Sequence, residues 1–139
     1  MTEDSFRSID EDRAGPLGPC AVLLCGFAAE EAVELAPWLD QAQAPGHRLV
    51  FCAEAMLGRT LGEALSREAA GPPLPREKLP RVIILSGMRP TQIRALVGNY
   101  GGTGLPRPIF ASVTPANLGR RVRDLLVDLL REHAAMNRT

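Results

Sequence analysis

Lysine, histidine and cysteine are scarce in this chain, and their scarcity excludes several chemistries. Lys78 is the only lysine, so neither a phosphate-binding Gly-Lys-Ser/Thr loop nor a well-placed Schiff-base lysine is available. The two histidines, His47 and His133, are far apart in sequence, which argues against a histidine-rich metal site. Three cysteines without a Cys-x-x-Cys pair are typical of reduced, buried thiols. The sequence therefore predicts no metal centre and no cofactor.

Net charge and long apolar runs are also lacking. Sixteen Lys+Arg balance sixteen Asp+Glu, which argues against a general polyanion binder. No aromatic residues interleave Arg120, Arg121 and Arg123, so nucleic acid is not an expected partner. The longest apolar run, Ala21 to Ala29, is about half as long as a membrane helix requires. With an acidic start that does not resemble a secretion signal, we expect a cytoplasmic protein without a membrane partner.

Composition divides the chain into one domain and its flanks. A length of 139 residues suits a single domain, and the acids before Gly15-Pro16-Leu17-Gly18-Pro19 indicate a tail. The predicted segments are an acidic flexible tail at 1–19, a single α/β domain over 20–134 with repeat units 21–69 and 81–134 joined by a Pro-rich linker at 70–80, and a tail at 135–139.

The two units show the same pattern of strand, helix, strand and helix. The apolar runs 21–25 and 81–86 both end at a glycine, Gly26 or Gly87, and an amphipathic helical pattern follows each one. The matching apolar positions of the two units lie at a constant offset of 61 residues. We interpret this offset as an internal duplication.

The fold class follows from these alternating elements. Continuous apolar runs suit strands buried on both faces of a parallel sheet. Right-handed crossovers then favour a three-layer, flavodoxin-like α/β fold with a four-stranded parallel sheet in the order 2-1-3-4. In this order the proline-bracketed strand 108–112 lies at an edge. Two local features add detail: Pro37 predicts a kink or stop near Ala36, and Thr114 with Pro115 predicts the start of the last helix.

A parallel sheet in this order predicts a ligand site where the turns after the first and third strands diverge. Helix N-termini and an arginine fork at that rim would favour a small anionic ligand. An alternative is that both glycines only make tight turns and that the arginines are solvated. The candidate ligand-binding residues are Gly26, Phe27, Ser86, Gly87, Arg89, Thr114 and Asn117.

We predict no catalytic residues. Ser86 needs a histidine base, but a parallel sheet puts His47 at the opposite edge and His133 at the end of the last helix. Cys25 and Cys52 end strands that we expect to be neighbours, so a redox pair is an open alternative. No lysine, arginine or histidine stands next to either cysteine in sequence to lower its pKa.

Two resemblances add to this picture. The runs Val82–Ser86 and Pro108–Ala111 are similar to the later strands of response-regulator receiver domains, but the acidic cluster and lysine of that family are missing, so only a flavodoxin-like shape is implied. Ile84-Leu85-Ser86-Gly87, the Thr-Pro-x-Asn element at Thr114–Asn117 and Arg131-Glu132-His133 resemble an uncharacterised bacterial family, a domain of unknown function. This second resemblance covers about residues 81–133 and implies no activity.

The function expected from the sequence is a non-enzymatic module that binds a partner or a small anionic ligand. One alternative is an enzyme that acts on a phosphorylated or acyl substrate with the Ser86 and Thr114 hydroxyls and Arg89. Another is a structural homodimer formed through edge strand 108–112 or the last helix.

Overall fold

The computed structural model describes residues 20–41, 47–66 and 79–137. The predicted tail 1–19, residues 70–78 of the linker and residues 138–139 lie outside this part. The strands are β1 (Ala21–Cys25), β2 (Arg48–Phe51), β3 (Val82–Ser86) and β4 (Ile109–Ser112). The α-helices are α2 (Ala32–Gln41), α3 (Leu61–Ser66), α4 (Pro90–Asn99), α5 (Pro115–Leu118) and α6 (Val122–Asn137), and short 3₁₀ turns are η1 (Ala29–Glu31), η2 (Glu54–Met56) and η4 (Tyr100–Thr103).

The strands form one sheet in the predicted order β2-β1-β3-β4, but the sheet is mixed. β1 is parallel to β2, and β3 is parallel to β4, whereas β1 and β3 are antiparallel, with Ala21 opposite Ser86 and Cys25 opposite Val82. The prediction of an all-parallel, flavodoxin-like sheet was therefore wrong. Burial on both faces gives a strand an apolar sequence whatever the direction of its neighbour, so the pattern carries no information on direction.

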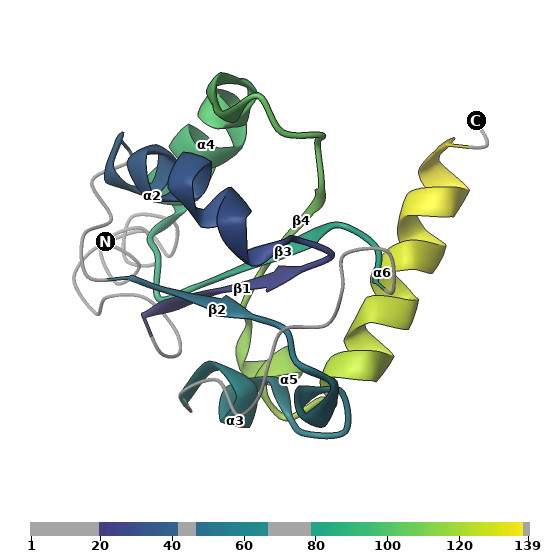
Figure 1. Ribbon diagram of the computed structural model, residues 1–139. Coiled ribbons are helices and arrows are strands. Elements are labelled where there is room, and N and C mark those ends of the chain that lie inside the picture. Colours follow the sequence, from purple (N-terminus) through teal and green to yellow (C-terminus); the bar gives the residue numbers. More distant parts are fainter. Residues whose placement is uncertain (1–19, 42–46, 67–78, 138–139) are drawn as a thin grey trace, which may run out of the picture.

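Strand direction decides which face each crossover helix covers. α2 connects β1 to β2, and α4 connects β3 to β4, so each unit is a β-α-β crossover. Because such crossovers are right-handed, antiparallel central strands bring both crossover helices to the same face. Figure 1 shows α2 and α4 together on one side of the sheet, with α3, α5 and α6 on the other.

The core consists of two apolar clusters, one on each face of the sheet. Every residue of β1 and β3 is buried, as predicted, and successive side chains enter alternate clusters. Leu23 and Ile84 pack with α3 and α6, whereas Val22 and Leu85 pack with α2 and α4. The two central strands therefore contribute side chains to both clusters.

Three aromatic rings join the two units beneath α2 and α4. Trp38 lies edge-on to Tyr100 with a centroid distance of 5.3 Å, and Tyr100 lies edge-on to Phe110 at 5.4 Å. The indole Nε1 of Trp38 donates to the carbonyl of Leu96 at 2.8 Å. Burial raises the pKa of Tyr100, whose hydroxyl donates to the carbonyl of Pro106 at 3.0 Å. These contacts tie α2 of the first unit to α4 and β4 of the second.

Two helix boundaries differ from the sequence predictions. α2 runs through Pro37 without ending near Ala36. The carbonyl that Pro37 leaves without an N–H partner belongs to Val33, which is 74% exposed and can be hydrated. Thr114 caps only the short α5, and the chain then makes an isolated bridge between Arg121 and Thr60 before α6 begins. The single long helix predicted after Thr114 is therefore two helices.

Candidate functional site

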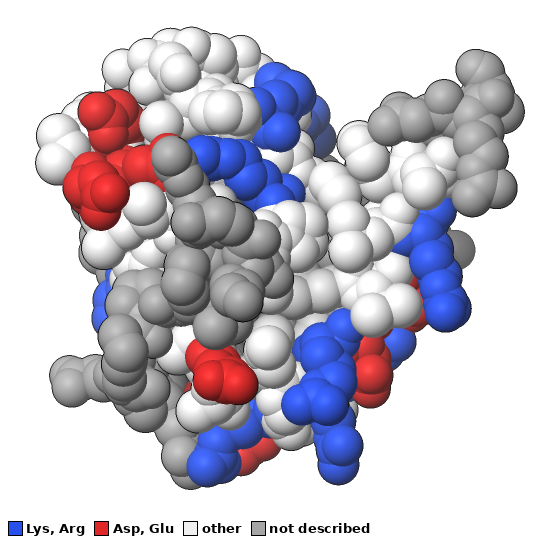
Figure 2. Space-filling view, turned by 45° about the vertical axis from the view of Figure 1, so that its right-hand side comes forward, with Lys and Arg blue, Asp and Glu red and all other residues white. Residues whose placement is uncertain are grey.

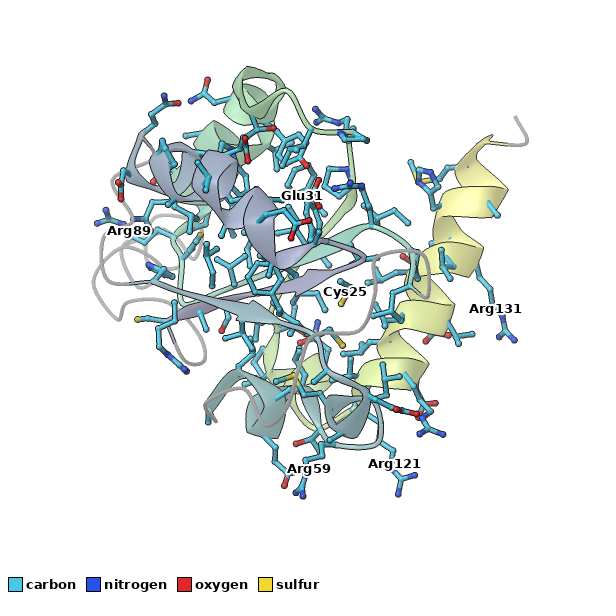
Figure 3. The ribbon with its side chains drawn as sticks, viewed as in Figure 1. Cys25, Glu31, Arg59, Arg89, Arg121 and Arg131 are labelled. Carbon is cyan, nitrogen blue, oxygen red and sulfur yellow. The ribbon has the colours of Figure 1, made fainter. Side chains whose placement is uncertain are left out.

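The candidate ligand-binding residues lie at opposite ends of the sheet. Gly26 and Phe27 follow β1 at one end, where Pro80 and Arg81 lead into β3. The other candidate residues follow β3 and β4 at the far end, so Figure 3 shows Arg89 well away from Cys25. The shared rim that a parallel sheet would provide does not exist, because the antiparallel pairing of β1 and β3 separates the two turns.

Gly26 and Gly87 both make left-handed turns, with φ values of 75° and 74°. A Cβ atom added to Gly26 would lie 2.5 Å from the carbonyl oxygen of Pro80. Glycine is therefore required at this turn by backbone conformation and by the close approach of the chain that enters β3. This geometry agrees with the tight-turn alternative.

Phe27 lies in a charged cluster that sequence reasoning missed. The guanidinium carbon of Arg81 lies 4.6 Å from the centre of the Phe27 ring, and Arg81 Nη2 donates to Glu31 Oε2 at 3.0 Å. Glu31 Oε1 also accepts the backbone N–H of Ala28 at 2.8 Å. Arg81 Nη1 is buried, and no described residue forms a hydrogen bond with it. The cluster joins the turn after β1 to the start of β3. Glu31 and Arg81 are fifty positions apart in sequence, so no sequence motif could have predicted their contact.

At the other end, Thr114 and Asn117 satisfy each other. The Thr114 hydroxyl accepts the backbone N–H of Asn117 at 3.2 Å, and Asn117 Oδ1 accepts the N–H of Thr114 at 2.8 Å. Asn117 Nδ2 also donates to the carbonyl of Ser112 at 3.2 Å. This reciprocal pattern is a capping box, so the Thr-Pro-x-Asn element has a structural role at the start of α5.

Replacing Thr114 with alanine is expected to lower the free energy of unfolding by about 1 kcal/mol, because the N–H of Asn117 loses its side-chain acceptor and keeps only the backbone carbonyl of residue 114. Thr114→Ser retains the hydroxyl and is expected to stay close to the wild type. Urea denaturation followed by circular dichroism measures both variants. Equal stability of Thr114→Ala and Thr114→Ser would contradict the capping role.

Ser86 and His47 are closer than the sequence argument expected. The amino end of β2 and the carboxyl end of β3 lie at the same end of the sheet, on either side of β1, and His47 Nε2 lies 2.9 Å from the carbonyl oxygen of Gly87. The geometric reason for separating them was wrong. Among the described residues the buried Ser86 hydroxyl has no hydrogen-bond partner, so the His47 imidazole does not contact it as a general base would. Arg89 is exposed, and its backbone N–H donates to Gln92 Oε1 at 2.9 Å.

Cys25 is the last residue of β1 and Cys52 follows β2, and these strands are neighbours, as predicted. Both residues are buried, whereas Cys20 is exposed. A hydrogen bond between the two thiols raises the pKa of Cys25 and lowers the pKa of Cys52. Among the described residues no group of three or more His, Cys, Asp or Glu side chains is arranged to hold a metal ion.

Basic side chains gather near α3 and α6, but the contacts of several are internal. Arg59 pairs with Glu63 at 3.6 Å, and Arg120 pairs with Asp128 at 2.7 Å. Arg123 Nε donates to the carbonyl of Leu57 at 3.4 Å. Figure 2 shows acidic side chains among the basic ones on this part of the surface. The pattern is a mixed-charge surface more than a continuous basic patch.

Fold and site together define a small α/β domain with a mixed four-stranded sheet, a capped turn after β4 and a buried dithiol. Residues 81–136 match the model of a family described as a domain of unknown function, DUF3783. This match agrees with the resemblance found in the second unit. No curated protein and no solved structure matches the chain. No helix in the described residues has the length and apolar character needed to cross a membrane.

Proposed function

We propose that the protein is a non-enzymatic interaction module that pairs with a second copy of itself through the outer face of α6. The observation that carries this proposal is an apolar helix face that the described fold leaves uncovered. Val127 is 45% exposed and Leu130 is 41% exposed, and no described residue from Leu130 to Met136 is buried. Figure 1 shows this end of α6 extending away from the sheet.

The outer end of α6 gains little from packing within the domain. Val122, Leu125 and Leu126 bury the first part of the helix, but its last two turns contact no core cluster. Short helical segments are marginal in water without an apolar partner surface. Val127, Leu130 and Ala134 recur at intervals of three and four residues, so they form one stripe along the helix.

Charge along the stripe favours a second copy as the partner. Asp124 and Arg131 lie seven residues apart, two helical turns, and therefore flank the stripe on the same side. Figure 3 shows Arg131 directed outward from α6. When two copies of α6 pair antiparallel about a twofold axis, Asp124 of each copy faces Arg131 of the other. The helix therefore presents a self-complementary surface.

The alternatives drawn from the sequence have less support. An enzyme that uses Ser86 and Thr114 would need two hydroxyls free to react, but Ser86 is buried and the exposed Thr114 hydroxyl accepts the N–H of Asn117. A small ligand bound by the turns after β1 and β3 would have to span the length of the sheet, because these turns lie at opposite ends. Neither is therefore proposed.

Sedimentation equilibrium over a concentration series tests the proposed dimer. We expect the wild type to dimerise with a dissociation constant in the micromolar range, and Leu130→Asp to weaken association at least tenfold, because a carboxylate would enter the apolar stripe. Val33→Asp is the matched control, because Val33 is an exposed valine on α2, remote from α6. A monomeric wild type at all concentrations, or equal weakening by both variants, would contradict the proposal.

A charge exchange tests the antiparallel arrangement. Asp124→Arg and Arg131→Asp are each expected to weaken the dimer, because like charges would meet across the interface. The double variant restores opposite charges and is expected to recover most of the lost affinity. An additive loss in the double variant would exclude this pairing.

We also infer that the two units are duplicated copies related by a half-turn about the normal to the sheet. All four strands support the inference, because β3 and β4 begin and end 61 residues after β1 and β2. Leu23 pairs with Ile84 and Thr60 bridges to Arg121, so each of these residues contacts the residue 61 positions away. Contacts of this kind are expected on a twofold axis.

Hydrogen bonds recur at the same offset. The 2.8 Å bond from the N–H of Leu61 to the carbonyl of Arg120 matches the 2.9 Å bond from Val122 to Arg59. Three further pairs of bonds donated by backbone N–H groups recur 61 residues apart. In two of them the acceptor is a backbone carbonyl: Cys52 to Leu24 with Val113 to Leu85, and Arg48 to Cys20 with Ile109 to Arg81. In the third the acceptor is a side-chain oxygen: Ala28 to Glu31 with Arg89 to Gln92. The DUF3783 match covers one such unit. In crystallographic coordinates, residues 21–56 are expected to superpose on 82–117 by a half-turn, and any other rotation would contradict the inference.

A further inference from the structure

Cys25 and Cys52 occupy adjacent positions where β1 and β2 end. The parallel register pairs Leu24 with Phe51, and the N–H of Cys52 donates to the carbonyl of Leu24 at 2.9 Å, so the pairing continues into the two cysteines. Both side chains enter the same apolar cluster, between the sheet and the layer that contains α3 and α6. Figure 3 shows Cys25 on this side of the sheet.

Strand spacing permits a bond between the two sulfurs. Neighbouring strands lie about 4.8 Å apart, within the range of Cα separations, about 4.4–6.8 Å, that disulfides span. The two thiols are close enough to shift each other's pKa, and Cys52 Sγ also donates to the backbone carbonyl of Ala53 at 3.8 Å. The corresponding positions in the second unit hold Ser86 and Val113, so the dithiol is particular to the first unit.

The environment differentiates the two thiols. The interaction between the two thiols lowers the pKa of Cys52 and raises the pKa of Cys25. Cys52 also follows the edge strand β2, whereas Cys25 is the last residue of the central strand β1. Opening of the sheet edge would therefore expose the more nucleophilic sulfur first.

We propose that Cys25 and Cys52 form a reversible disulfide when the protein meets a hydroperoxide. The Cys52 thiol first loses its proton, and the resulting thiolate attacks one peroxide oxygen. The O–O bond breaks, and the leaving alkoxide or hydroxide takes up the proton that Cys52 lost. Cys25 then attacks the sulfur of the Cys52 sulfenic acid, the S–O bond breaks, and water leaves with the Cys25 proton. Two thiols are oxidised to one disulfide, and the peroxide is reduced to alcohol and water.

Hydrogen peroxide and the full chain carrying Cys20→Ser provide the test, because this variant leaves only the two buried thiols. We expect both thiols to be lost together, with a mass decrease of two hydrogen atoms. Arg48 is the only tryptic site between the cysteines, so a linked peptide would join residues 14–48 to 49–59. Oxidation is expected to raise the urea midpoint by about 1 M, and dithiothreitol is expected to reverse it.

Cys52→Ser and Cys25→Ser, each with Cys20→Ser, are the matched controls. With Cys52→Ser the remaining thiol is expected to react far more slowly, because Cys25 is fully buried at the end of the central strand β1. With Cys25→Ser a sulfenic acid on Cys52 is expected, which dimedone traps. Thiols that stay reduced, mass gains from sulfinic acid without a linked peptide, or disulfides between chains would each overturn the proposal.

Discussion

Replacing Gly26 with alanine is expected to lower the free energy of unfolding by about 3 kcal/mol. The residue has a φ of 75°, which costs an alanine about 1–2 kcal/mol. Its Cβ would also lie 2.5 Å from the carbonyl oxygen of Pro80, and a rigid backbone atom cannot move aside as a side chain does. Urea denaturation followed by circular dichroism measures the loss.

Gly104→Ala is the matched control for this substitution. Gly104 has nearly the same φ, 74°, but no atom of the described residues lies within 4 Å of an added Cβ. Its loss is expected to be about 1 kcal/mol, from backbone strain alone. The difference between the two variants therefore measures how closely the chain entering β3 approaches the end of β1. Equal losses would contradict the antiparallel arrangement, because only that arrangement brings Pro80 beside Gly26.

Trp38→Ala is expected to cost about 4 kcal/mol, the largest loss expected from any of these substitutions. The indole is buried between the units, contacts Tyr100 and donates to the carbonyl of Leu96. Alanine would leave a cavity and remove the indole donor from the carbonyl of Leu96 on α4. Because the tryptophan is also the only one in the chain, circular dichroism in urea is the suitable measurement.

Trp38→Phe separates the two contributions. Phenylalanine keeps most of the aromatic contact but cannot donate to Leu96, so we expect a loss of about 1–2 kcal/mol. A Trp38→Ala variant as stable as Trp38→Phe would show that the aromatic packing between α2, α4 and β4 contributes little. That result would remove the main contact that joins the two units on this face of the sheet.

Sequence patterns predicted the elements and the strand order well. The apolar runs identified β1 and β3 as central, and the prolines near β4 indicated an edge strand, because both features depend on burial and on missing N–H donors. Strand direction was not encoded in these patterns. The connection between α3 and β3 is long enough for β3 to enter the sheet from either end, so local spacing could not decide between the two arrangements.

Which candidate site residues lie together depends on the direction of β3 relative to β1. The site was therefore the part of the structure that the sequence predicted least well. Thr114 was correctly predicted as a helix cap, since its signal is local and lies within four residues. The ion pair between Glu31 and Arg81 depends on a contact between the units, so no local sequence pattern predicts it. The contact between His47 and Gly87 was not predicted either, because a parallel sheet would place these two residues at opposite edges.

Nuclear Overhauser contacts between β1 and β3 test the direction of the central strands most directly. The antiparallel pairing predicts backbone contacts of Val22 with Leu85 and of Leu24 with Ile83 in a uniformly labelled sample. Contacts of Val22 with Ile83 and of Leu24 with Leu85 would instead indicate parallel strands. That second pattern would restore a shared rim at one end of the sheet and contradict the separation of the two turns.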